Sequence, residues 1–248
     1  MGTAFVFKRV EKKYLVDQYQ IDTFLQAIEP YVNNDLYGQY TVCNIYFDTE
    51  HYDLIRTSID KPVYKEKLRL RSYGVPKGDN KVFLEIKKKY KGVVYKRRIT
   101  MTLDEARLYL NDGIKPNNDC QILREIDYFI NHYKPEPKLY LAYDRQAFSG
   151  KDDPQLRITV DHNIRSRQQM VDLGAGDYGT ALLNDDQYLI ELKTSTAFPL
   201  WLTNILSEYL IYPTSFSKYG SIYSKSIANQ DVKKTINKKE CRQCFQAS

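Results

Sequence analysis

The chain has 248 residues, of which 42% are hydrophobic, and its formal net charge is +6 at neutral pH. This length and composition suit one large domain or two small ones with a substantial core, and they argue against a disordered chain. The basic balance favours an anionic partner, namely nucleic acid, nucleotide, polyphosphate or a membrane surface, without choosing among them.

Strand-like and helical patterns divide the chain. Strands are expected at residues 4–15, 38–49, 62–73, 80–90, 92–102, 138–148, 155–164 and 187–195. Helices are expected at residues 17–32 with Asp17 as N-cap, at 103–110 after Thr102, at 119–133 and at 200–211. Lys91-Gly92 joins two long runs so tightly that it predicts a hairpin. Because three strands are consecutive, the prediction is an α+β fold with a mainly antiparallel sheet that could close.

Domain extent, cysteine usage and hydropathy indicate what kind of protein and which cellular compartment to expect. Residues 1–228 are expected to form one domain, and residues 229–248 a polar tail that contains Cys241 and Cys244. The four cysteines suit neither a disulfide framework nor a zinc site, which is typical of a reducing, cytoplasmic compartment. No run approaches the ~20 apolar residues of a membrane span, so a soluble protein is expected. A membrane-bound partner and the oligomeric state stay open.

Several predicted strands alternate charged and apolar residues with period two. Lys65, Lys67, Arg69 and Arg71 share one face of one strand, where like charges repel unless an anion lies opposite them. The same alternation occurs at Glu85/Lys87, Lys96/Arg98, Arg157/Asp161 and Glu191/Lys193. An open sheet would expose these charges to water, whereas a closed sheet would turn them inward as a cationic tunnel for a polyanion such as a phosphate chain. In the second case Asp161 would face the tunnel or pair with Arg157.

An ordered set of short motifs supports the second picture. The motifs are Glu11-Lys12-Lys13-Tyr14, Tyr46-Phe47-Asp48-Thr49, Lys67-Leu68-Arg69-Leu70-Arg71-Ser72-Tyr73-Gly74, Phe83-Leu84-Glu85-Ile86-Lys87, Tyr143-Asp144-Arg145, Arg157-Ile158-Thr159-Val160-Asp161, Ile190-Glu191-Leu192-Lys193 and Ser217-Lys218-Tyr219-Gly220. With them the sequence resembles the VTC (vacuolar transporter chaperone) domain. That domain is the polyphosphate-polymerase branch of the triphosphate tunnel metalloenzyme (CYTH-like) superfamily.

The resemblance implies an eight-stranded antiparallel β-barrel tunnel with flanking helices. It also implies an enzyme that transfers the γ-phosphate of ATP to a growing polyphosphate chain and releases ADP. By motif, the catalytic cations would be Lys13, Arg69, Arg71, Lys87, Arg145, Arg157 and Lys218. Further substrate contacts would come from Lys67, Lys96, Arg98, Tyr143, Lys193 and Ser217. Mn²⁺ or Mg²⁺ would be held by Glu191, with Glu85 and Glu11 as the other candidate ligands.

Two departures from the superfamily bear on the choice of activity. Its hydrolases typically open with ExExK, whereas Arg9-Val10-Glu11-Lys12-Lys13 keeps only the second acid, which favours a polymerase over a triphosphatase or a cyclase. Nothing resembles the inositol-phosphate-sensing domain or the membrane helices of the eukaryotic complex, so a stand-alone soluble protein is expected. A tripolyphosphate or nucleoside triphosphate hydrolase and a non-catalytic polyphosphate-binding protein remain alternatives. Nucleic acid is not the expected partner, because alternation sends Lys88 and Arg97 to the face opposite their basic neighbours.

Overall fold

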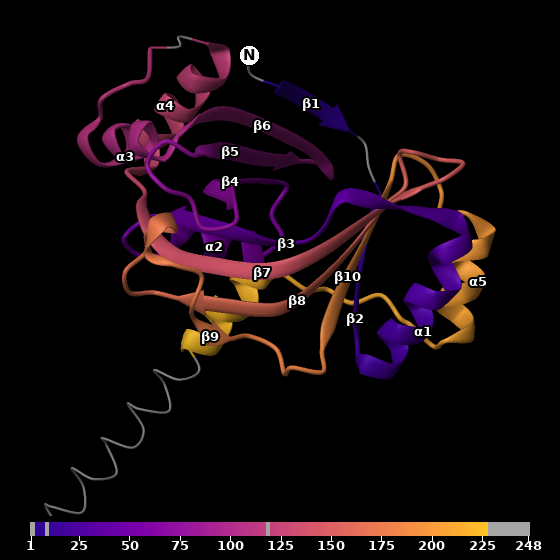
Figure 1. The fold of residues 1–248 in the computed structure, drawn as a ribbon. Coiled ribbons are helices and arrows are strands. Elements are labelled where there is room, and N and C mark those ends of the chain that lie inside the picture. Colours follow the sequence, from indigo (N-terminus) through magenta and orange to yellow (C-terminus); the bar gives the residue numbers. More distant parts are fainter. Residues whose placement is uncertain (1–2, 8–9, 118–119, 228–248) are drawn as a thin grey trace, which may run out of the picture.

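The computed structural model describes residues 3–7, 10–117 and 120–227. One strongly curved antiparallel sheet dominates it (Figure 1). The described strands are β1 Thr3–Phe7, β2 Val10–Val16, β3 Val32–Asp48, β4 Tyr64–Tyr73, β5 Lys81–Tyr90, β6 Val93–Thr102, β7 Glu136–Gly150, β8 Arg157–Arg167, β9 Thr180–Ala181 and β10 Tyr188–Thr194. The helices are α1 Gln18–Ile28, α2 Asp53–Ile59, α3 Leu103–Asp112, α4 Gln121–Tyr133 and α5 Leu200–Glu208, and residues 218–227 are also helical.

The sheet confirms the predicted α+β class but differs from an eight-stranded barrel. Its described strands run in the order β1-β6-β5-β4-β3-β7-β8-β10-β2, with β9 paired to β8. The run expected as one strand at 4–15 is two strands, and these lie at opposite ends of the hydrogen-bonded path. Within the described ranges β1 and β2 do not pair with each other, so the sheet curls around an interior without a closed ladder.

Local sequence signals account for the ends of several elements. The Asp17 side chain accepts from the Gln20 backbone N–H at 2.8 Å, which caps α1 as predicted. Thr102 caps α3 in the same manner. The predicted hairpin joins β5 to β6, and Lys91 and Gly92 adopt φ values of 46° and 84°, as a tight two-residue hairpin turn requires.

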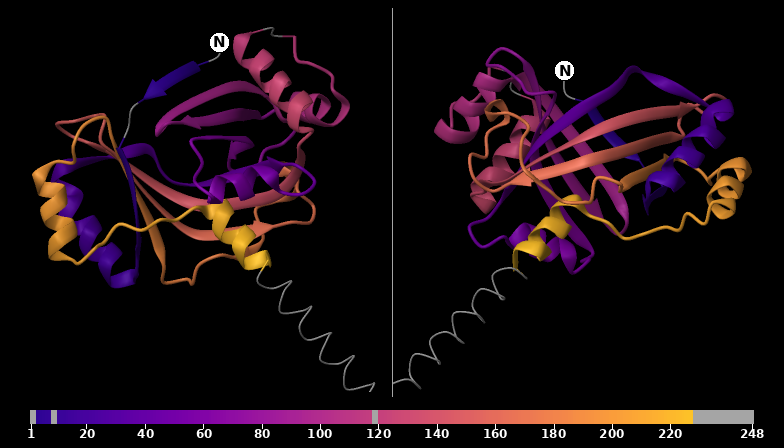
Figure 2. Two further views of the ribbon diagram at one scale, coloured as in Figure 1. Left: turned by 180° about the vertical axis from the view of Figure 1, so that it is seen from behind. Right: turned by 60° about the horizontal axis from the view of Figure 1, so that its bottom comes forward.

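The helices cover the outer, apolar face of the sheet at two places. Figure 2 shows α3 and α4 gathered at one end of the sheet and α1 with α5 at the other. Leu68 and Leu84 of the sheet pack into the core under α3 and α4, around Ile126. Ile158 and Leu192 pack with Phe24 of α1. Because the outer face is apolar and covered, period-two alternation turns the charged residues inward.

No helix in the described part of the chain is long and apolar enough to cross a membrane.

Two helices were not expected from the sequence, α2 and residues 218–227. Figures 1 and 2 show that they lie beside each other next to the sheet.

Candidate functional site: a cationic cavity inside the sheet

The inner face of the sheet encloses a cavity of about 340 Å³. Its walls come from β2, β3, β4, β5, β6, β7 and β10 and from the start of helix 218–227. The lining residues are Glu11, Lys13, Tyr46, Lys67, Arg69, Arg71, Glu85, Lys87, Lys96, Tyr143, Arg145, Glu191, Lys193, Ser217, Lys218 and Tyr219. We call this the inner cavity.

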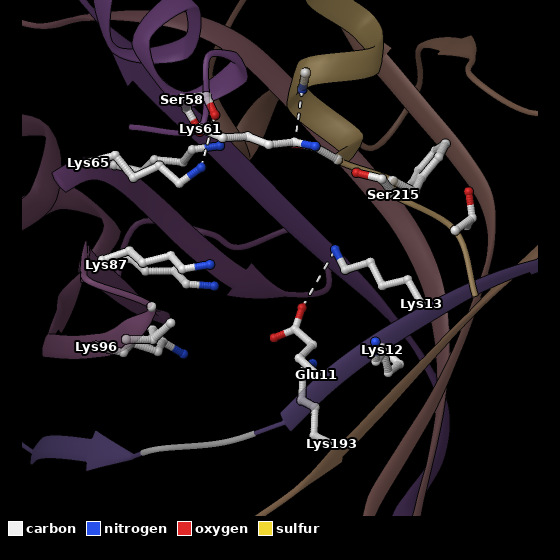
Figure 3. Close-up of a pocket in the computed structure, with 18 of the residues that line it drawn as sticks. Glu11, Lys12, Lys13, Ser58, Lys61, Lys65, Lys87, Lys96, Lys193 and Ser215 are labelled. Atoms are coloured by element: carbon white, nitrogen blue, oxygen red, sulfur yellow. Dashed lines mark hydrogen bonds and ion pairs between the residues drawn. The ribbon is translucent and has the colours of Figure 1, made fainter. Parts of the chain in front are cut away.

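A second, larger cavity of about 1620 Å³ adjoins the inner one and shares part of its wall. Figure 3 shows lysine side chains from several strands reaching into it. Its lysines are Lys12, Lys13, Lys61, Lys65, Lys67, Lys87, Lys89, Lys96 and Lys193. We call this the outer cavity, and five lysines line both cavities, namely Lys13, Lys67, Lys87, Lys96 and Lys193.

The structure brings most of the predicted site residues together. All of them line the inner cavity except Arg98 and Arg157, which line the outer cavity. The Arg98 guanidinium lies 4.8 Å from the centre of the Phe83 ring. The Arg157 side chain is 44% exposed and lies 3.5 Å from the Asp35 carboxylate, so it belongs to the rim of the site.

Glu191 is the centre of one charge cluster in the inner cavity. In the sheet it pairs with Lys13 of β2, and its Oε1 lies 3.3 Å from Lys13 Nζ and 3.2 Å from Lys218 Nζ. Its Oε2 lies 2.7 Å from Lys193 Nζ and 3.9 Å from Arg145. Burial raises the pKa of the Glu191 carboxyl, but the surrounding cations, Lys218 foremost, outweigh burial and hold that pKa well below its usual range. Glu191 is therefore ionised and surrounded by positive charge.

Asp161 forms the second half of this cluster and was not among the predicted site residues. The Arg145 guanidinium donates to both carboxylate oxygens, at 2.6 and 2.8 Å, and Lys218 Nζ donates at 2.6 Å. The alternative that Asp161 pairs with Arg157 is wrong, because Arg145 lies directly opposite it on β7. Only the register of β7 against β8 reveals this pairing, and local sequence does not encode that register.

Glu85 anchors a second cluster on β4, β5 and β6. Its side chain is 1% exposed, with Arg69 Nε at 2.6 Å and Lys96 Nζ at 2.7 Å. Burial raises the pKa of Glu85, but Arg69 more than reverses this and the net pKa is strongly lowered. The carboxylate thus holds two cations toward the cavity.

Other lysines are crowded by positive charge. Burial, with further lowering by Lys65, Lys87 and Lys13, brings the pKa of Lys67 down to about 8. Burial lowers the pKa of Lys96 to about 8, with Arg69 as the main neighbouring cause. Cations held this close together destabilise one another unless an anion binds between them.

Asn44, which was not predicted from the sequence, and Tyr143, which was, hold Arg71 in place. Arg71 Nε donates to Asn44 Oδ1 at 2.8 Å, and Arg71 Nη2 donates to the Tyr143 hydroxyl at 3.1 Å. Asn44 and Tyr46 share the inner face of β3 with period two. That alternation next to the Tyr46-Phe47-Asp48-Thr49 motif was the available signal.

The carboxylates fit a divalent cation only if phosphate supplies most of its ligands. No group of three His, Cys, Asp or Glu side chains with metal-binding geometry exists within residues 3–7, 10–117 and 120–227. Glu11 Oε1 and Glu191 Oε1 nevertheless lie 3.7 and 3.3 Å from the same Lys13 ammonium. Mg²⁺ is commonly held by one or two carboxylates together with substrate phosphates and water, which matches this pair.

Comparisons with known proteins define the family. The VTC domain model matches residues 8–227, nearly the whole chain. The chain belongs to the VTC domain family. A protein related to this VTC domain is vacuolar transporter chaperone complex subunit 4 of Schizosaccharomyces pombe, which is 24% identical over 72% of this chain. The alignment spans only 30% of the length of that protein.

A solved structure shares the fold of this VTC domain. It is described as a "putative adenylate cyclase" from Bacillus halodurans and superposes with a TM-score of 0.56 at 17% identity. The match covers 86% of this chain and 95% of the other. At this identity the similarity shows a common architecture, and activity has to be argued from the cavity.

Proposed function

We propose that this VTC domain is a polyphosphate polymerase that transfers the γ-phosphate of ATP to the end of a polyphosphate chain and releases ADP. The observation that carries the proposal is the pair of adjoining cationic cavities. The inner cavity groups three guanidinium groups, those of Arg69, Arg71 and Arg145, and nine lysines are among the residues that line the outer cavity. A small anion needs only the first, whereas a polymer of phosphates also needs a basic path beyond it.

The chemistry follows from charge. The terminal oxygen of the acceptor chain attacks the γ-phosphorus of ATP, a new P–O bond forms, and the bond to the β-phosphate oxygen breaks as ADP leaves. In this proposal Arg69, Arg71 and Arg145 bind the phosphate oxygens in the inner cavity. Lys67 and Lys96 add positive charge where negative charge accumulates. No side chain of the protein becomes covalently attached.

Mn²⁺ or Mg²⁺ is the proposed cofactor, with Glu191 and Glu11 as its protein ligands. Such an ion neutralises phosphate charge and aligns the transferred group when bound. Glu85 is the weakest of the three candidates, because Arg69 and Lys96 already contact its two oxygens. Its proposed part is to orient these cations.

The test is a product analysis with purified protein, ATP and Mn²⁺ or Mg²⁺. The proposal expects ADP together with phosphate chains that resist dialysis and are degraded by a polyphosphatase. Orthophosphate without chains would replace the polymerase by a triphosphatase on the same site. ATP that stays intact while polyphosphate binds would indicate a non-catalytic binder.

Two variants and a matched control assign the reaction to the interior. Arg69→Ala is expected to weaken triphosphate binding by roughly tenfold or more, because it removes a charge-assisted contact. Glu191→Ala is expected to abolish turnover with less effect on affinity. The control is Arg97→Ala, since Arg97 lies on the outer face of β6, two strands from β4 in the same sheet, and pairs with Glu125. Equal losses in Arg69→Ala and Arg97→Ala would indicate binding to the general basic surface.

A further inference from the structure

A buried carboxylate outside the cavity, Asp48 at the end of β3, collects four hydrogen bonds that the proposed reaction does not use. Its side chain is fully buried. One oxygen accepts from the backbone N–H groups of Thr49 and Leu54, both at 2.9 Å. The other accepts from the Ile55 N–H at 3.0 Å and from the Tyr219 hydroxyl at 2.8 Å. A carboxylate with this set of donors joins segments far apart in the sequence.

Two of the donors belong to the first turn of α2. The residue before this helix, Tyr52, is left-handed at φ 60° and its side chain makes no capping bond. Asp48 supplies the missing acceptor, as a capping side chain would. The far end of α2 then reaches the outer cavity, where Ser58 lines the wall and its carbonyl accepts from Lys65 Nζ at 2.9 Å.

The fourth donor belongs to helix 218–227. Tyr219 follows Lys218 directly, and its ring packs on Tyr46 with the ring centres 5.1 Å apart. Lys218 is 8% exposed and extends into the inner cavity, where it reaches both Asp161 and Glu191. The bond from Tyr219 to Asp48 is therefore made one residue away from a cavity cation.

We propose that Asp48 is a positioning residue that acts through Tyr219 to fix Lys218 inside the inner cavity. The bond to a charged acceptor is stronger than one to a neutral group, so it restrains the first turn of the helix. The restraint sets the Lys218 ammonium where it can exchange its carboxylate contacts for phosphate oxygens. The inference rests on the proposed function only in that the inner cavity must bind triphosphate.

The experiment is a double-mutant cycle on the affinity for inorganic tripolyphosphate, measured by calorimetry. Tyr219→Phe removes only the hydroxyl and keeps the ring on Tyr46, and it is expected to weaken binding roughly fivefold. Lys218→Met is expected to weaken binding roughly tenfold. The double variant is expected to bind no more weakly than Lys218→Met, because Tyr219 acts through Lys218. Tyr223→Phe, one turn further along the same helix, is the matched control and should bind as the parent does.

Several results would overturn the proposal. Parent-like affinity in Tyr219→Phe, even with a lower melting temperature, would make the bond merely structural. Additive losses in the double variant would show that Tyr219 acts independently of Lys218. Asp48→Asn, alone and combined with Lys218→Met, forms a second cycle. Its loss of affinity must likewise disappear when Lys218 is already replaced. Binding of tripolyphosphate needs no turnover, so a failure to make polyphosphate would count against the proposed function alone.

Discussion

Neutralising Glu85 tests directly whether its buried carboxylate is the counter-ion of Arg69 and Lys96. The side chain is 1% exposed and lies 2.6 Å from Arg69 and 2.7 Å from Lys96. Glu85→Gln keeps the shape and removes the charge, which leaves two cations in the interior without their counter-ion. Removing one partner from a buried pair costs about 3–5 kcal/mol. For a chain of this size that free energy corresponds to a fall in melting temperature of roughly 6–20 °C.

The same variant should respond more strongly to ligand. An anion replaces the missing charge, so tripolyphosphate is expected to bind Glu85→Gln more tightly than the parent and to raise its melting temperature further. Ligand at 100 times the dissociation constant adds about 2.7 kcal/mol of stability. Thermal unfolding with and without tripolyphosphate measures both effects.

The control for this variant lies one strand away on the opposite face. Glu66→Gln removes a carboxylate of β4 whose nearest cation, Lys88, is 3.7 Å away. Its expected cost is smaller than that of Glu85→Gln, because its ion pair is longer than either of the two at Glu85, and no gain in ligand response is expected. If Glu85→Gln melted within 2 °C of the parent, or if tripolyphosphate stabilised it less, the counter-ion role of Glu85 would be refuted.

Three further predictions concern the lowered lysine pKa values, the face of β5 on which each lysine lies, and the N-cap of α1. Because the pKa values of Lys67 and Lys96 are lowered to about 8, triphosphate affinity should be full below pH 8 and fall as pH rises through it. Calorimetry at pH 8 in two buffers should then show proton uptake on binding, and its absence would contradict the lowered pKa values. Lys87→Ala should weaken tripolyphosphate binding and reduce its salt dependence, whereas Lys88→Ala, on the other face of β5, should not. Equal effects of the two substitutions would mean that Lys87 and Lys88 do not lie on opposite faces of the strand. Asp17→Ala should lower the free energy of unfolding by about 1 kcal/mol and leave the affinity for tripolyphosphate unchanged. A denaturant titration that shows an unchanged free energy of unfolding would refute a stabilising role for the Asp17 cap.

The sequence was most informative where the signal is local. Alternation with period two placed Lys67, Arg69 and Arg71 on one face, and the structure puts all three in the wall of the inner cavity. The caps at Asp17 and Thr102 depend on neighbours three residues away, so they were also accessible.

Features that depend on pairing between distant segments were missed. Asp161 meets Arg145 and Lys218 only because β7 and β8 pair in one particular register and helix 218–227 returns to the cavity. The run at 4–15 looked like one strand because no glycine, proline or other turn-forming residue interrupts it, while its two halves pair with β6 and β10 at opposite ends of the sheet. The expected polar tail at 229–248, with Cys241 and Cys244, lies outside the described residues.

The placement of β1 and β2 has a consequence for how the interior is held shut. These strands terminate the two extremities of the sheet, yet Phe7 and Val10 are only three peptide steps apart, so their Cα atoms can be separated by no more than about 11 Å. Among the described residues, chain connectivity and not a ladder of hydrogen bonds keeps these two margins near each other. Parting these two margins to widen the interior would therefore break none of the backbone ladders that the described strands form.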